Sequence, residues 1–65
     1  MEELAPRQAK ILLLIGMGFD VTQISHEFHL KEERINMFID TIKQKTGMQS
    51  WEELQKLAQS MRDAE

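Results

Sequence analysis

The sequence predicts an all-α domain of four short helices with no strand. Apolar residues recur at three- and four-residue steps, glycines interrupt this pattern at helical lengths, and capping residues precede some of the apolar runs. The helices are expected near residues 6–17, 21–28, 32–46 and 51–62 of a single domain spanning 1–65.

The first helix is predicted by Pro6, because the amide hydrogen that proline lacks would have no partner in a first turn. Ile11, Leu14 and Ile15 form its inward stripe. Gly18 offers a left-handed cap, so we expect the helix to end there.

The second helix is predicted by a capping box. The Asp20 carboxylate can accept a hydrogen bond from the backbone of Gln23, and the Gln23 side chain can reciprocate. His29 and Leu30 then form a short turn before a third helix that begins near Lys31. Two helices joined by a short turn are typical of a helix-turn-helix, a motif used primarily to bind nucleic acid.

The third helix is expected to end at Gly47. Ser50 and Glu53 form a second capping box, which opens the fourth helix. The inward faces of the helices together predict a buried core: Ile11, Leu14, Ile15, Ile24, Phe28, Ile35, Ile39, Ile42 and Leu54.

Composition restricts the classes of function. A chain of 65 residues buries little surface and, with no cysteine, has no disulfide to stabilise it, so dimerisation or a tight helical core is expected. The lack of cysteine excludes thiol chemistry and fits a cytoplasmic location. No apolar run is long enough for a membrane span, and a net charge of -3 is unusual for a free-standing DNA-binding protein.

Several segments follow one another at fixed spacings: Leu4-Ala5-Pro6-Arg7-Gln8, Gly18, Gln23-Ile24-Ser25, Arg34-Ile35-Asn36-Met37-Phe38-Ile39 and Lys45-Thr46-Gly47-Met48. They resemble the LuxR/GerE-type helix-turn-helix domain, whose motifs are Leu-Thr-Pro-Arg-Glu, a Gly, Glu-Ile-Ala, Thr-Val-Lys-x-His-Val and Lys-Leu-Gly-Val. That domain is the DNA-binding output module of many bacterial regulators. The resemblance therefore implies a bacterial transcriptional regulator that dimerises and binds DNA.

The resemblance places the third helix in the major groove of DNA. Asn36 would then hydrogen-bond an adenine edge, Met37 would touch a thymine methyl, and Asp40 would accept from a cytosine amine while repelling phosphate. The phosphate contacts would come from Lys31, Arg34 and Lys43. The same charges also fit an ordinary solvated helix face.

Two further groups of residues are candidates for protein contacts. Leu13 and Met17 lie one turn apart on the first helix, away from its inward stripe, and would attract a partner if exposed; alternatively, the fourth helix or a terminus covers them. Trp51, Leu57 and Met61 lie on the fourth helix, through which the family commonly dimerises; alternatively, Trp51 covers the end of the core.

These groups support a rival function. A helix-turn-helix protein that has lost DNA binding could instead bind and inhibit another regulatory protein. His26 and His29 are three residues apart, but no third ligand is fixed by spacing, so we expect no metal, no cofactor and no enzymatic activity.

Overall fold

The computed structural model describes residues 3–63, with side chains up to residue 61, and this part of the chain contains four α-helices and no strand. The helices are α1 (Pro6–Gly16), α2 (Val21–Phe28), α3 (Glu32–Thr46) and α4 (Trp51–Asp63). The all-α class is therefore confirmed. Helix α1 ends one residue earlier than expected and α4 one residue later.

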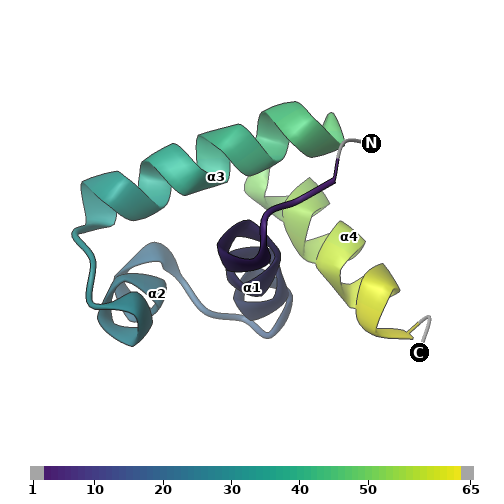
Figure 1. Cartoon of the computed structure of the whole chain (residues 1–65). Coiled ribbons are helices and arrows are strands. Elements are labelled where there is room, and N and C mark those ends of the chain that lie inside the picture. Colours follow the sequence, from purple (N-terminus) through teal and green to yellow (C-terminus); the bar gives the residue numbers. More distant parts are fainter. Residues whose placement is uncertain (1–2, 64–65) are drawn as a thin grey trace.

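The other helices all lie on one side of α3, which is the longest at 15 residues (Figure 1). Helix α1 occupies the middle of the molecule and packs against both α3 and α4, whereas α2 packs against α3. The opposite side of α3 is left uncovered by the helices of the described chain (Figure 1).

Gly18 ends α1 by adopting a left-handed conformation, with φ +97°. Its N–H donates to the carbonyl of Ile15 at 3.1 Å, and the N–H of Phe19 donates to the carbonyl of Leu14 at 3.1 Å. These two bonds make a Schellman motif, which satisfies carbonyl groups that the end of a helix would otherwise leave unpaired. The expected stop signal is therefore confirmed.

Both predicted capping residues are observed. Asp20 accepts from the Gln23 backbone at 2.8 Å, and the Gln23 side chain accepts from the Asp20 backbone at 2.9 Å, which completes the box at α2. At α4 the Ser50 hydroxyl accepts from the Glu53 backbone at 3.2 Å. The Glu53 carboxylate accepts from the backbone of Gln49, at 3.2 Å, instead of from the backbone of Ser50.

The turn between α2 and α3 depends on His29, which has φ 56° and ψ 40°. The N–H of Leu30 donates to the carbonyl of Ser25 at 3.0 Å, and the Ser25 hydroxyl donates to the carbonyl of Leu30 at 2.6 Å. This pair of bonds closes the short connection between α2 and α3. A non-glycine residue in this conformation is unusual, because its Cβ crowds the following carbonyl.

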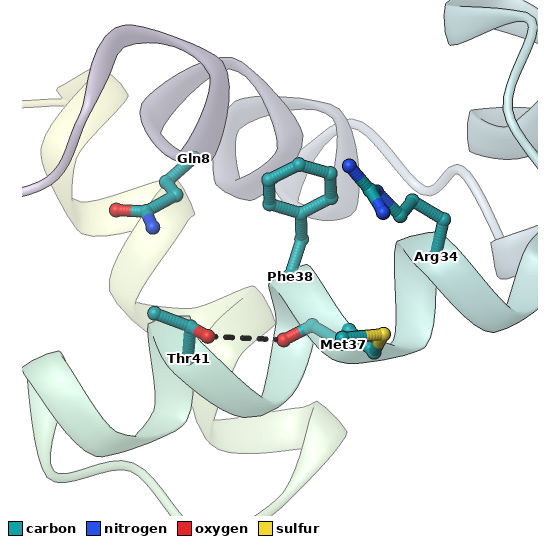
Figure 2. Close-up of a pocket in the computed structure, with 5 residues that line it drawn as sticks. All are labelled: Gln8, Arg34, Met37, Phe38 and Thr41. Carbon is teal, nitrogen blue, oxygen red and sulfur yellow. Dashed lines mark hydrogen bonds between the residues drawn. The ribbon is translucent and has the colours of Figure 1, made fainter.

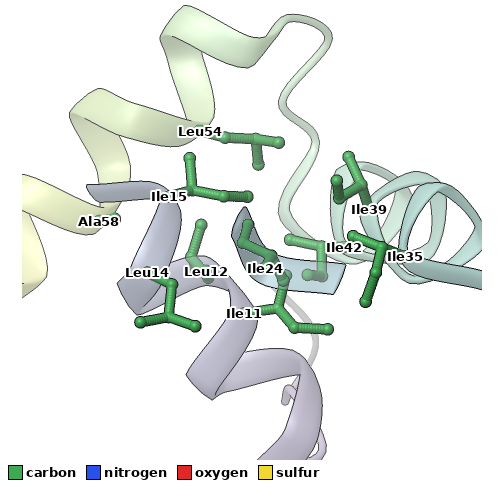
Figure 3. Packing of buried hydrophobic residues seen from close by; sticks show 10 residues of the cluster. All are labelled: Ile11, Leu12, Leu14, Ile15, Ile24, Ile35, Ile39, Ile42, Leu54 and Ala58. Atoms are coloured by element: carbon green, nitrogen blue, oxygen red, sulfur yellow. The ribbon is translucent and has the colours of Figure 1, made fainter. Parts of the chain in front are cut away.

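The core joins side chains from every helix, and Ile24 of α2 lies between the residues of α1 and those of α3 (Figure 3). The buried hydrophobic residues are Ile11, Leu12, Leu14, Ile15, Ile24, Ile35, Ile39, Ile42, Leu54 and Ala58. All of the predicted core residues are among them except Phe28, which is half-buried. That prediction was wrong because Phe28 is the last residue of α2, where its ring borders solvent and lies under the Lys10 ammonium.

Leu12 is buried, although it lies outside the stripe expected for α1. It is buried because α4 packs closely against that side of α1, where a Cβ added to Gly16 would lie only 2.5 Å from the Cβ of Ala58. Two helices approach this closely only when at least one of them lacks a side chain at the crossing point. Gly16 is therefore required by packing, not by its backbone conformation.

We expect Gly16→Ala to destabilise the domain by about 1 kcal/mol. The added methyl group overpacks the crossing at a cost of about 1–3 kcal/mol, and the gain in helix propensity of about 1 kcal/mol offsets only part of that loss. Urea denaturation followed by circular dichroism measures the change. Ala58→Gly removes the atom that the new methyl group would meet. The free energy of unfolding of the double variant should therefore fall by less than the sum of the decreases in the two single variants. Additive losses would contradict the close contact.

The start of α1 is only half capped. Gln8 accepts from the backbone N–H of Ala5 at 3.0 Å, but the methyl group of Ala5 cannot return a hydrogen bond to the helix. One amide of the first turn therefore depends on solvent.

We expect Ala5→Thr to stabilise the domain by about 1 kcal/mol, because the hydroxyl can accept from the free amide of the first turn. For a domain of this size that corresponds to a rise of about 4–8 °C in Tm. Ala5→Val is the matched control, since valine is branched like threonine but offers no acceptor. An equal rise in Tm for both variants would show that capping is not the cause.

Candidate functional site

Helix α3 is the longest helix of the described chain, and one of its sides is left uncovered by the other helices (Figure 1). Its inward face is used by Ile35, Ile39 and Ile42, which are all buried. The outward face carries the residues expected to touch base edges. Asn36 and Asp40 are exposed, and Met37 is 63% exposed despite its apolar side chain.

Helical geometry places Met37 and Asp40 between two cations of α3. Successive residues of an α-helix lie about 100° apart around its axis, so Arg34 and Lys43, nine positions apart, lie about 180° from each other. On the outward side between them, Met37 lies about 60° from Arg34 and Asp40 about 60° from Lys43, whereas Asn36 lies only about 20° from Lys43, two turns earlier along the helix. We call these three residues the ridge and the positions of Arg34 and Lys43 its flanks. The third cation expected to hold a phosphate, Lys31, is exposed at the N-cap of the helix.

The ridge side of α3 also carries negative charge. Glu33 and Asp40 are exposed there, and Glu32 is exposed about 20° from Lys43 around the axis, so the Lys43 flank carries both signs of charge. In a major groove the ridge would face base edges and the flanks would face the phosphates, so Glu33 and Asp40 would lie away from phosphate, whereas Glu32 would lie on a flank that faces phosphate. Cytosine amino groups can donate to a carboxylate in that position.

A groove runs along the Arg34 flank between α3 and the N-terminal end of α1 (Figure 2). It has a volume of about 290 Å³ and is lined by Gln8, Arg34, Met37, Phe38 and Thr41. The guanidinium carbon of Arg7 lies 5.9 Å from the centre of the Phe38 ring, within the range of a cation–π interaction. Sequence reasoning missed this cluster because its members come from helices far apart in the chain.

Gln8 holds α1 in register with α3 at this groove. Its side-chain oxygen accepts from the ammonium group of Lys45 at 2.9 Å as well as from the backbone of Ala5 at 3.0 Å. One amide thus links the start of α1 to the last turn of α3, and Lys45 is directed toward α1 and away from the ridge.

The candidate dimer residues on α4 do not form one surface. Trp51 and Leu57 are half-buried and pack against the core on either side of the stripe made by Leu54 and Ala58, whereas Met61 is 44% exposed. The outward face of α4 is polar, with exposed Glu52, Lys56, Gln59 and Ser60. Trp51 therefore covers the end of the core, as the alternative interpretation expected, and part of its side chain stays exposed.

Leu13 and Met17 are exposed on α1, at 44% and 53%. The alternative that α4 covers them is wrong, because α4 packs on the side of Leu12 and Gly16. The exposed pair points away from the inward residue Ile11, and so away from α3. A partner bound there would leave the ridge free.

His26 and His29 are both exposed, and the described residues include no group of three side chains placed to hold a metal ion. Within the same part of the chain, no helix is long and apolar enough to cross a membrane.

Comparisons with known proteins add no family to this description: no family model matches the chain, and no curated protein or solved structure is significantly similar to it. The resemblance to LuxR/GerE-type domains therefore depends on the motifs of the sequence, and the function must be argued from the surface of α3.

Proposed function

We propose that the protein is a transcriptional regulator that binds DNA by inserting α3 of a LuxR/GerE-type helix-turn-helix into the major groove. The observation that carries the proposal is the division of the free side of α3 into a ridge with hydrogen-bonding and apolar side chains and two cationic flanks. A major groove is about 12 Å wide and admits one α-helix, with base edges at its floor and a phosphate backbone on each side. This division of side chains suits that environment.

Each residue has a defined role in the proposal. Asn36 hydrogen-bonds an adenine edge, Met37 contacts a thymine methyl, and Asp40 accepts from a cytosine amine. Phosphates are held by Lys31, Arg34 and Lys43. Two copies bind neighbouring half-sites in the cytoplasm, as the resemblance implies, and the exposed Met61 and the edge of Trp51 lie at their contact.

We expect Lys43→Ala to weaken binding to all duplexes and to reduce the slope of log affinity against log salt by about one unit, because one phosphate contact is lost. Asp40→Asn should tighten binding, since it removes a negative charge from a helix surrounded by phosphate. Fluorescence anisotropy with duplexes selected from a random pool measures both effects.

Lys56→Ala is the matched control for these substitutions, because it removes the same charge from the outward face of α4. An equal loss of duplex affinity in the Lys43→Ala and Lys56→Ala variants would indicate a general effect of net charge. The proposal fails if no duplex binds at low salt.

The exposure of Leu13 and Met17 favours a second candidate function, in which the protein binds and inhibits another regulatory protein. Under that function the acidic residues of α3 have no phosphate to repel. The apolar pair on α1 then forms the centre of the contact, where anchoring residues usually lie.

For this second candidate we expect Leu13→Glu to abolish capture of a regulatory protein from lysate while leaving Tm within about 2–4 °C, because an exposed substitution usually changes stability by at most about 0.5 kcal/mol. Ser60→Glu, which adds the same charge on exposed α4, should capture the partner normally. Retention of the partner by the Leu13 variant would exclude this surface.

A further inference from the structure

Two guanidinium groups converge on Phe38 at one flank of α3. Arg7 comes from the first turn of α1 and lies over the ring, while Arg34 lines the groove beside the ring (Figure 2). They are 27 positions apart in the sequence and meet because α1 packs against α3.

The groove beside these cations lacks a carboxylate among the residues that line it, which are Gln8, Arg34, Met37, Phe38 and Thr41. The chain as a whole has 11 acidic residues against eight basic ones. A groove lined by Arg34 and no acid, with Arg7 over its Phe38 wall, therefore departs from the average surface. Apolar walls strengthen the field of nearby charges because they exclude water. The site therefore favours an anionic ligand.

Phe38 fixes where that ligand would bind. The Arg7 guanidinium lies 5.9 Å from the ring centre, near the outer limit of a cation–π interaction, and those of its N–H groups that do not point at the ring can donate hydrogen bonds. Arginine presents these donors in a planar fork that matches the oxygens of a phosphate. Phe38 thus limits the positions that the exposed Arg7 can adopt and leaves its donors available.

We propose that Arg7 is a phosphate-binding residue of this domain and that Arg7 and Arg34 together hold the DNA backbone on the α1 side of α3. The inference rests on the proposed function, because the groove lies along the flank that faces a backbone when the ridge faces the bases. It extends the contact surface from α3 to the start of α1. The contacts to the two DNA backbones are then asymmetric, with two arginines on this flank of α3 and Lys43 on the other.

The chain offers a matched control for Arg7. Lys10 lies one turn later on α1 and is also placed over a half-buried phenylalanine, with its ammonium 5.6 Å from the centre of the Phe28 ring. Phe28 belongs to α2 and does not line the groove. Arg7→Ala and Lys10→Ala therefore remove the same charge and the same kind of contact from one helix, but only the first alters the groove.

The test is a salt titration of duplex binding by the whole chain, followed by fluorescence anisotropy, with Tm measured for each variant. Arg7→Ala should reduce the slope of log affinity against log salt by about 0.9, which is about an eight-fold loss in affinity for each tenfold reduction in salt relative to the wild type. Lys10→Ala should leave the slope within error. Arg7→Lys keeps the charge and should retain the slope.

The outcomes separate this inference from the proposed function. Equal slopes for the Arg7→Ala and Lys10→Ala variants, with a reduced slope for Lys43→Ala, would overturn the role of Arg7 and leave α3 as the DNA-binding helix. If the wild type shows no salt-dependent binding to a duplex, both the role of Arg7 and the proposed function are overturned. Binding of a glutamate-rich peptide that Arg7→Ala abolishes, with duplex binding unchanged, would assign the groove to an acidic protein and also overturn the inference.

Discussion

The arrangement depends on the burial of α1, which contacts both of the longer helices that follow it. Helix α3 covers one side of α1 and α4 another, and the residues at these contacts, Ile11, Leu12 and Ile15, are almost fully buried. A chain of 65 residues with no disulfide has little other apolar surface with which to define its fold. The close crossing at Gly16 is what allows α4 to reach that side of α1.

This packing also defines the candidate site. Because α1, α2 and α4 all lie on one side of α3, the residues of α3 divide into a buried stripe and a free ridge without any further element (Figure 1). Gln8 then fixes how far along α3 the start of α1 lies, through its bond to Lys45. The position of Arg7 over Phe38 follows from the same contact. The fold and the candidate site therefore share their determinants near the start of α1.

The two candidate surfaces face opposite directions. The ridge of α3 is polar and acidic with cationic flanks, whereas Leu13 and Met17 form a small apolar area on the outer side of α1. Physically the two surfaces need different ligands, because counterion release favours phosphate at the flanks and apolar burial favours protein at α1. Their separation means that occupation of one does not obstruct the other.

The sequence by itself determined where helices begin and end. Asp20, Gly18 and Gly47 act through bonds to residues within a few positions of themselves, so their effects can be predicted without knowledge of the fold. Helical periodicity likewise identified the inward residues of α3, because only one of its faces is apolar.

Only the tertiary structure decided which side of α1 is buried by α4. Leu12 and Leu13 are adjacent and chemically identical, yet one is 1% exposed and the other 44%, because the side that α4 covers is set by the crossing of Gly16 and Ala58. The cluster of Arg7 and Phe38 was also beyond sequence reasoning, since 31 positions separate the two residues. Local signals act over a few residues, whereas contacts between distant helices depend on how all the helices pack at once.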